Sequence, residues 1–460
     1  MLNLCALLED SARRYADRPA FTSENKTLSF GQVNDAANQV AALLTTLDVS
    51  PGDKVCICIP NIPEFPIIYY GILKAGAIVV PLSTMLRKDE LAYYLTDSEA
   101  KIFISFCGTD DSPIGKQAYD AFRECGSCDF FFLVGKTLAV AGAEDVPYID
   151  DVLKNHKEHF ETTQTRADDT AVIVYTSGTT GAARGAELSH ANLFINAVVS
   201  SDILQSGHSD VQLMVLPLFH IFGMTVMMNA GLYKGVHSVM LSKFEAGEVL
   251  RLMQAYSVSI FAGVPTMYWS LLNQGPHDFD YRNVADKLRI CISGGASLAI
   301  EILSQFEEKF SVPILEGYGM SEGSPVVTFN QLETGRRPGS IGTPVWGVEV
   351  KVVDAGGQEV PAGVKGELCY RGHNVMKSYY KKPADTKVVL KNGWLHSGDV
   401  AIKDEDGFYF IVDRIKDIII RGGITVYPRE IEEVLMQHPA ISLSSVIGVP
   451  NEKWGEEIKA

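Results

Sequence analysis

Residues 175–185 read Tyr175-Thr176-Ser177-Gly178-Thr179-Thr180-Gly181-Ala182-Ala183-Arg184-Gly185 and contain more chemical information than any other segment of the chain. An apolar run at 171–174 precedes them and predicts a buried strand, and Ser189 after them is predicted to cap a helix. Glycines let a backbone approach a ligand, and hydroxyls, free N–H groups and a guanidinium are suitable donors to phosphate oxygens. The segment therefore predicts a phosphate-binding loop, with a flexible surface loop as the alternative. It is not a Walker A loop, because no Gly-Lys-Ser/Thr closes it.

Composition limits what the whole chain can be. Its 460 residues are too many for one core, and 46% hydrophobic with 21% charged residues is ordinary for a soluble globular protein. A net charge of −16 argues against duplex nucleic acid and anionic membranes as partners. No apolar run has the length of a membrane span, and the N-terminus has no basic signal-peptide region, so a cytoplasmic protein with reduced cysteines is expected. A structural role is favoured for the lone CxxC at Cys125–Cys128.

Helical and strand patterns alternate over residues 30–135. Predicted strands cover 54–59, 77–80, 101–105 and 129–134, and predicted helices cover 34–44, 65–75 and 87–95. Such alternation predicts a parallel, doubly wound sheet. Further along, Pro217 is expected to end a strand, a helix is expected from about Ile221, and Pro265 is expected to open another helix.

The second half of the chain contains a further set of motifs. In Leu315-Glu316-Gly317-Tyr318-Gly319-Met320-Ser321-Glu322, an aromatic ring between glycines is free to lie against a base, and the Ser-Glu pair could meet a phosphate and its metal. A tight turn with a buried tyrosine is the alternative for this segment. Residues 338–412 are predicted to be all β and to form a small distorted barrel, and Asp399 ends a turn from which a carboxylate could accept ribose hydroxyls.

The ordered motifs resemble those of the AMP-forming acyl-adenylate superfamily, which includes acyl-CoA synthetases, luciferases and adenylation domains of peptide synthetases. The resemblance covers essentially the whole chain, although Ala183-Arg184 replaces the usual Pro-Lys. It implies an α/β fold: a large N-terminal domain (1–413) of two doubly wound sheets and a distorted β-barrel near 338–412. A hinge and an incomplete small α+β C-terminal domain (414–460) would follow.

The resemblance also implies roles for individual residues, with ATP, Mg²⁺ and CoA as cofactor and co-substrates. Four residues would be catalytic, with Glu322 also the metal ligand: Arg184, His220, Ser321 and Glu322. Nucleotide and phosphates would be held by Thr176, Ser177, Gly178, Thr179, Thr180, Gly181, Gly185, Gly295, Ala296, Glu316, Gly317, Tyr318, Gly319, Asp399 and Arg414. The acyl group would lie against Met227, Gly263 and Val264, the hinge would pivot at Lys416, and Gly422 and Gly423 would leave room for pantetheine.

The surrounding sequence most resembles bacterial medium- and long-chain fatty acid–CoA ligases. Two alternatives stay open: an aryl- or other carboxylate–CoA ligase, and a non-catalytic adenylate-binding relative. The second alternative is considered because the superfamily's C-terminal catalytic lysine has no counterpart before Ala460. Residues 428–450 are expected to lean on the large domain or to be partly mobile. A homodimer is compatible with these features, and acyl chain length cannot be read from the sequence.

Overall fold

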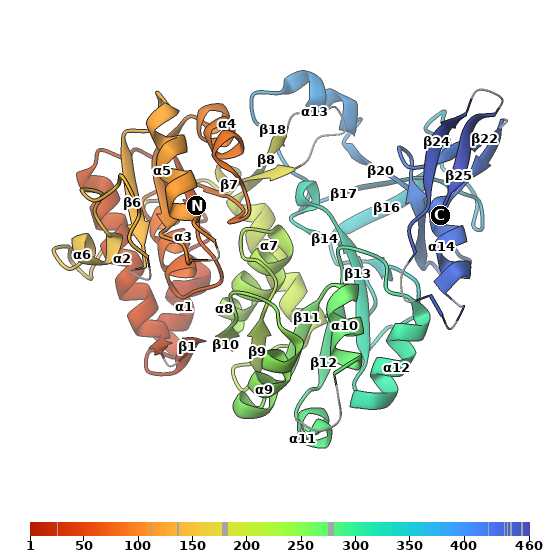
Figure 1. Ribbon diagram of the computed structural model, residues 1–460, viewed down its shortest axis with the longest axis horizontal. Helices are drawn as coiled ribbons and strands as arrows, with labels where there is room; N and C mark the ends of the chain where they lie inside the picture. The colour runs from red at the N-terminus through yellow and green to blue at the C-terminus, as the bar shows by residue number, and fades with distance from the viewer. Residues whose placement is uncertain are drawn as a thin grey trace.

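A computed structural model describes residues 1–24, 26–110, 112–135, 138–176, 183–274, 280–421, 423–436, 438, 440–441, 444–451 and 454–460. In this part of the chain the strands form four sheets of nine, seven, five and four strands. Figure 1 shows the chain running from the seven-stranded sheet through the nine-stranded sheet to the barrel strands and the C-terminal sheet. This arrangement confirms the predicted fold class.

The seven-stranded sheet is built mostly from the first 190 residues. Its order is β18 (Ser378–Tyr379), β8 (Arg184–Ser189), β7 (Thr170–Thr176), β4 (Ile78–Pro81), β3 (Lys54–Cys58), β5 (Ala100–Phe106) and β6 (Phe130–Val134). The strands from β7 to β6 pair in parallel, as the alternating pattern predicted, whereas β8 and β18 add antiparallel strands at one edge.

The nine-stranded sheet has a parallel centre and antiparallel ends. Its order is β15 (Thr343–Pro344), β14 (Val326–Phe329), β13 (Ile314–Gly319), β12 (Ile290–Ser293), β11 (Ile260–Gly263), β9 (Val211–Met214), β10 (His237–Met240), β1 (Pro19–Ser23) and β2 (Lys26–Ser29). Strand β15 lies in the section predicted to be barrel, yet it pairs with β14 through Thr328 and Phe329.

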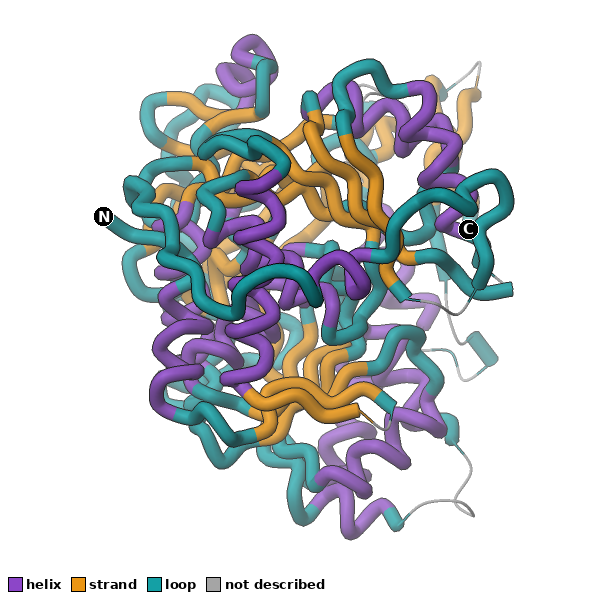
Figure 2. Tube along the Cα trace, turned by 90° about the vertical axis from the view of Figure 1, so that its left-hand side faces the viewer, coloured by secondary structure: helices purple, strands orange, loops and turns teal. Residues whose placement is uncertain are grey.

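Alternate residues of the central strands face different cores. In β3, Val55 and Ile57 belong to the core shared by the two sheets, whereas Cys56 and Cys58 belong to an outer core. In β12, Ile290 and Ile292 face the shared core and Cys291 faces a second outer core. Since side chains of a strand alternate between its faces, both large sheets are covered on both sides. Figure 2 shows the strands in layers with helices on their faces.

Helices cover both faces of the two sheets, and those that the sequence predicted begin within four residues of the predicted positions. The shared core is bordered by α1 (Ala6–Arg14), α2 (Phe30–Thr46), α3 (Glu64–Lys74), α6 (Ile149–Leu153), α7 (His190–Ile203), the π-helix η1 (Phe222–Asn229) and α8 (Ala230–Lys234). The outer cores are bordered by α4 (Lys88–Ser98), α5 (Ile114–Glu124), α9 (Ala246–Tyr256), α10 (Pro265–Leu272), α11 (Tyr281–Ala285) and α12 (Ile300–Phe310). No helix among the described residues is long and apolar enough to cross a membrane.

Side-chain caps explain several helix starts. Ser189 caps α7 as predicted. Its Oγ accepts from the Asn192 N–H, and the Asn192 Oδ1 accepts from the Ser189 N–H. Helix α2 begins at Phe30, four residues before the predicted start, because the side chains of Ser29 and Gln32 bond each other's backbone N–H groups in the same reciprocal way. Pro265 opens α10 as predicted.

The barrel section is less uniform than predicted. Its strands are β16 (Val348–Val353), β17 (Gly366–Gly372), β19 (Leu390–Lys391), β20 (Trp394–Lys403) and β21 (Tyr409–Arg414). However, the prediction that 338–412 is all β is wrong, because Pro383 starts the helix α13 (Pro383–Val389).

The C-terminal residues form a small sheet beside one helix. The sheet contains β22 (Ile419–Arg421), β23 (Ile424–Val426), β24 (Ile447–Asn451) and β25 (Gly455–Lys459), and the helix is α14 (Pro428–Met436). Helix α14 contacts the barrel: Arg429 donates to the Ile411 carbonyl at 2.7 Å and Lys365 pairs with Glu430 at 2.7 Å. These contacts agree with the prediction that this segment leans on the large domain.

Candidate active site

The candidate site lies where the parallel strands of the two large sheets end. The residues that end β7, β11, β12 and β13 are Thr176, Gly263, Ser293 and Gly319. Ligands of doubly wound sheets bind outside the carboxyl ends of their strands. The ends of β11, β12 and β13 lie side by side in one sheet, and β7 of the other sheet contacts η2 (Ser321–Gly323), which follows β13.

The predicted phosphate loop connects two antiparallel strands. Thr176 at the end of β7 pairs with Arg184 at the start of β8, a strand that the sequence did not predict. Gly185 leaves room for this pairing, because a Cβ there would lie 2.5 Å from Ile173. Ser177, Gly178, Thr179, Thr180 and Gly181 lie outside the described residues. The structure thus places the two ends of the loop, and the half-buried Arg184 points its Nε at Asp385, 3.2 Å away.

The glycines around Tyr318 are required by the neighbouring strand β14. A Cβ on Gly317 would lie 2.3 Å from the Phe329 ring, and one on Gly319 would lie 2.1 Å from the Pro325 carbonyl oxygen. Close approach of β14 and of Pro325 directly before it therefore explains both glycines. The Tyr318 hydroxyl donates to Asp399 Oδ2 at 2.5 Å, which joins the ring expected at the adenine to the carboxylate expected at the ribose.

Asp399 and Arg414 are also brought together. They pair across β20 and β21, and the Arg414 Nε lies 3.5 Å from Asp399 Oδ1. Burial raises the pKa of Asp399, and the hydrogen bond from Tyr318 and the charge of Arg414 oppose that rise. The carboxylate faces two donors in a partly dry setting, which suits recognition of a diol.

Glu316 has the most perturbed carboxyl group near this edge. Its side chain is only 9% exposed, and its Oε2 accepts from the Gly339 N–H at 2.8 Å. Burial raises its pKa to about 7, although the bond from Gly339 acts in the opposite direction. Glu316 consequently changes charge near neutral pH.

Glu322 lies on the short helix η2 (Ser321–Gly323), directly after the half-buried Ser321. Its side chain is 6% exposed, and its Oε1 accepts a hydrogen bond from the Tyr379 hydroxyl at 2.6 Å. Among the described residues its Oε2 has no partner. Mg²⁺ commonly takes one or two carboxylates together with phosphate oxygens and water, so this single carboxylate fits the ion.

His220 lies between β9 and η1. Its Nδ1 accepts from the Phe222 N–H at 3.2 Å, so Nε2 carries the proton of the neutral ring. The side chain is reached by solvent, yet the surrounding protein atoms desolvate it and lower its pKa. The neutral ring, which this shift favours, can donate a hydrogen bond from Nε2. The helix expected after it is a π-helix, and Gly223 allows its close approach to Pro217.

The residues predicted to meet the acyl group lie on three elements. Val264 is half-buried at the start of α10, 3.6 Å from the Cβ position of the exposed Gly295, which Ala296 follows. Gly263 is buried beside Phe261, and Met227 is fully buried on η1, where its carbonyl accepts from Gln212. Phe222 lies 3.2 Å from the Cβ position of Gly294 and adds an apolar surface that the sequence did not single out.

The predicted hinge residues are at the surface. Lys416 is exposed in the turn between β21 and β22, and Gly423 is exposed in the next turn. No atom of the described residues beyond its chain neighbours lies within 4 Å of the Cβ position of Gly423, and its φ of +84° is in the region that favours glycine. Gly422 lies outside the described residues.

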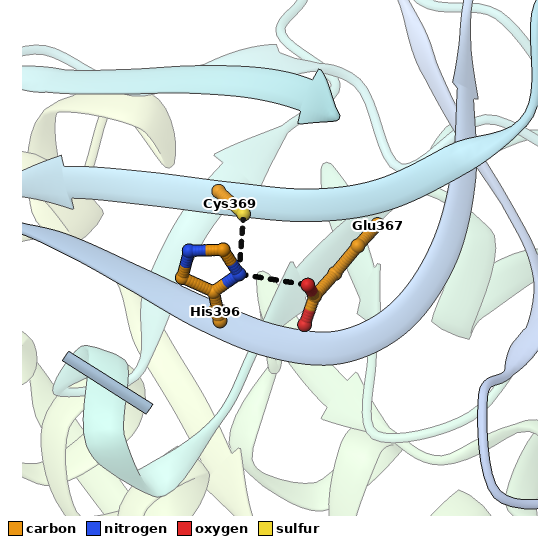
Figure 3. A group of neighbouring side chains, drawn as sticks. All are labelled: Glu367, Cys369 and His396. Atoms are coloured by element: carbon orange, nitrogen blue, oxygen red, sulfur yellow. Dashed lines mark hydrogen bonds and ion pairs between the residues drawn. The ribbon is translucent and has the colours of Figure 1, made fainter. Parts of the chain in front are cut away.

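A group of three side chains supports the part of strand β20 that carries Asp399, a residue that the sequence had wrongly placed at the end of a turn. Glu367, Cys369 and His396 point toward one another between β17 and β20 (Figure 3). His396 Nδ1 lies 2.7 Å from Glu367 Oε2 and 3.3 Å from the Cys369 sulfur, and Glu367 Oε1 accepts from the Gly398 N–H. Their ligand atoms lie within 4.8 Å of one another, so they could share a metal ion.

This group can also be explained without a metal. Burial raises the pKa of Cys369 to about 12, which keeps its thiol protonated. The bonds of Glu367 to His396 and Gly398 hold the chain directly before Asp399. The spacing of these residues in the sequence does not predict the group. Cys369 and His396 are 27 positions apart, and only the pairing of β17 with β20 brings them together.

Comparisons with known proteins agree with this geometry. The family model for "AMP-binding enzyme" matches residues 8–380. A long-chain-fatty-acid–CoA ligase of Bacillus subtilis is 32% identical, with 99% of this chain and 84% of that protein covered. An oxalate–CoA ligase of Arabidopsis thaliana is also 32% identical, with coverage of 99% and 87%.

Two solved structures are similar to this chain in fold as well as in sequence. The anthranilate CoA ligase AuaEII in complex with anthranoyl-AMP has a TM-score of 0.91 and 28% identity, with 99% of this chain and 86% of that chain covered. ATP-bound MatB from Rhodopseudomonas palustris has a TM-score of 0.87 and 32% identity, with coverage of 100% and 88%. The chain therefore belongs to the AMP-binding enzyme family and, within it, to the AMP-forming acid–CoA ligases.

Proposed function

We propose that this chain activates a medium- or long-chain fatty acid. With ATP and Mg²⁺, a carboxylate oxygen of the acid would attack the α-phosphorus, the bond between the α- and β-phosphates would break, and acyl-AMP and pyrophosphate would form. The sulfur of CoA would then attack the acyl carbonyl carbon and AMP would leave, with the thiol proton released to solvent.

The observation that carries the fatty-acid assignment is the apolar border of the site. Phe222 and Val264 are the side chains against the glycine pair that follows β12, and each is partly buried against the main core. An apolar wall favours a hydrocarbon chain, since each buried methylene adds up to about 0.8 kcal/mol. The similarity to long-chain-fatty-acid–CoA ligases supports the same substrate class.

The proposed roles of the polar residues follow from their contacts. Arg184 and Thr176 lie at the two ends of the phosphate loop, and Glu322 would hold Mg²⁺ through its Oε2. Mg²⁺, when bound, would neutralise charge on the phosphates. His220 would donate from Nε2 to the substrate carboxylate, and Ser321 would meet the α-phosphate. Tyr318 would lie against the adenine, and Asp399 and Arg414 would hold the ribose.

The C-terminal residues would serve thioester formation. The exposed turn at Lys416 would act as the pivot, and the loop that contains Gly423 would swing toward the large domain. CoA would enter along this loop.

An aryl acid is the second candidate substrate, because the fold is very similar to that of an anthranilate CoA ligase. A turnover assay with a panel of acids separates the two. The panel would contain butyrate, octanoate, dodecanoate, palmitate, benzoate and anthranilate, with AMP and acyl-CoA as the measured products. Highest kcat/KM for octanoate or longer acids supports the proposal, whereas highest kcat/KM for benzoate or anthranilate contradicts it.

Val264 offers a matched pair of variants for the same assay. Val264→Phe should fill the apolar space and shift the preferred acid to a shorter chain, whereas Val264→Ala should leave the preference unchanged or lengthen it. An equal loss on all acids in both variants would show that Val264 does not border the acyl group.

A further inference from the structure

We propose that Tyr379 is a positioning residue for the carboxylate of Glu322, and that it fixes this carboxylate relative to Arg184 of the phosphate loop. The inference rests on the proposed function, because it takes Glu322 as the Mg²⁺ ligand. It adds a residue to which the sequence motifs assigned no role.

The contact between the two side chains is direct and dry. The Tyr379 hydroxyl donates to Glu322 Oε1 at 2.6 Å, and Tyr379 and Glu322 are only 5% and 6% exposed. Because Oε1 is held by the phenol, the second oxygen of the carboxylate is left in a defined position for a cation. Hydrogen bonds to a charged group away from water are among the stronger ones in proteins.

The backbone around Tyr379 is bonded to both parts of the site. On one side the Met376 N–H donates to the Glu322 carbonyl at 2.9 Å. On the other side, β18 pairs with β8, with Tyr379 opposite Ala186, and the Tyr380 N–H donates to the Gly185 carbonyl at 2.7 Å. Residues 376–380 therefore connect η2 to the strand that starts at Arg184.

The ring of Tyr379 completes this connection. Its hydroxyl points at Glu322, and the Arg184 guanidinium carbon lies 5.5 Å from the ring centroid. Asp385, six residues beyond Tyr379, holds the Arg184 Nε at 3.2 Å. One aromatic ring thus lies between a carboxylate that would bind Mg²⁺ and a cation that would bind the same triphosphate.

Tyr370 provides a matched control close by. It is fully buried, its hydroxyl lies 2.9 Å from the Cβ position of Gly323, and that hydroxyl has no hydrogen-bond partner in the described part of the chain. Tyr370→Phe removes the same atom beside η2 without removing a bond to Glu322.

The test is calorimetric titration of the full chain with α,β-methylene-ATP, with Mg²⁺ and with EDTA. Tyr379→Phe should weaken binding about tenfold with Mg²⁺ and should not change it with EDTA, and Tyr370→Phe should change neither. Glu322→Gln should also weaken the Mg²⁺-dependent binding, and Tyr379→Phe added to Glu322→Gln should have no further effect. Thermal unfolding of each variant shows whether it is folded.

Three results would overturn the inference: unchanged Mg²⁺-dependent binding in Tyr379→Phe, an equal loss with and without Mg²⁺, or additive losses in the double variant. Each of these requires a wild-type chain that binds the analogue with Mg²⁺, and each leaves the proposed function standing. A wild-type chain that shows no Mg²⁺-dependent binding would overturn the inference together with the proposed use of ATP.

Discussion

Replacing Glu316 by glutamine should change how the stability of the large domain depends on pH. Glu316 is 9% exposed in the middle of β13, and burial raises its pKa to about 7 from an ordinary value of 4.5. Glutamine keeps an oxygen that can accept from the Gly339 N–H and has no proton to lose. The variant therefore isolates the cost of ionising this one group.

The size of the effect follows from the two pKa values. They differ by about 2.5, and at about 1.36 kcal/mol for each unit the ionisation costs about 3 kcal/mol more in the folded than in the unfolded protein. Since the folded pKa is raised, this cost is absent below pH 4.5, grows as the pH rises toward 7, and is fully present above it. At an unfolding entropy of about 2.1 cal/mol/K per residue over roughly 400 residues, about 3 kcal/mol corresponds to about 3–4 °C in Tm.

The assay is calorimetric unfolding of the wild type and Glu316→Gln between pH 5 and pH 8. The variant should unfold only about 1 °C higher at pH 5, where the cost of ionisation has begun to appear, and about 3–4 °C higher at pH 8. Glu308→Gln, on the exposed face of α12, is the control and should show no pH-dependent difference. A difference that is the same at both pH values, or a wild type that is the more stable at pH 8, would refute the reasoning.

Four further predictions concern the nucleotide, the acyl group and the scaffold. Asp399→Asn should raise the KM for ATP about tenfold in steady-state assays, because it weakens the contacts with Tyr318 and Arg414; an unchanged KM would count against a ribose role. His220→Ala should lower the rate of adenylate formation by about 100-fold, as measured by pyrophosphate exchange, since a neutral donor is lost; full activity would exclude that role. Ser189→Ala should lower Tm by about 1 °C in scanning fluorimetry, because an N-cap contributes about 1 kcal/mol, and no change would mean that the cap is replaced. Amide exchange should be faster in α14 than in β12, whose residues are fully buried or nearly so; slower exchange in α14 would contradict a segment that only leans on the barrel.

Local sequence patterns were sufficient to predict the parallel strands of the seven-stranded sheet. Strands β3, β4, β5 and β6 lie within one or two residues of their predicted positions, because a buried parallel strand is a continuous apolar run. The Ser189 cap was also predictable, since its signal lies within four residues.

Features that depend on distant partners were not predictable in this way. Strands β15 and β18 have two residues each, and neither carries a signal of its own, so only pairing with β14 and β8 defines them. Strand pairing also brings His396 to Glu367, 29 positions away, and the Tyr379 hydroxyl on β18 reaches Glu322 on η2, 57 positions away. The roles of the motif residues came from the resemblance, whereas their supporting residues became visible only in the structure.

Calorimetric titration with non-hydrolysable acyl-adenylate analogues of increasing chain length tests the central claim most directly. Acyl-sulfamoyl adenosines with acetyl, butyryl, octanoyl and dodecanoyl groups would be compared with the benzoyl analogue. If the chain binds fatty acyl adenylates, the affinity should rise by up to about fourfold for each methylene, which corresponds to about 0.8 kcal/mol, and then level off. Affinity that does not change with chain length, or tighter binding of the benzoyl than of the octanoyl and dodecanoyl analogues, would contradict the account.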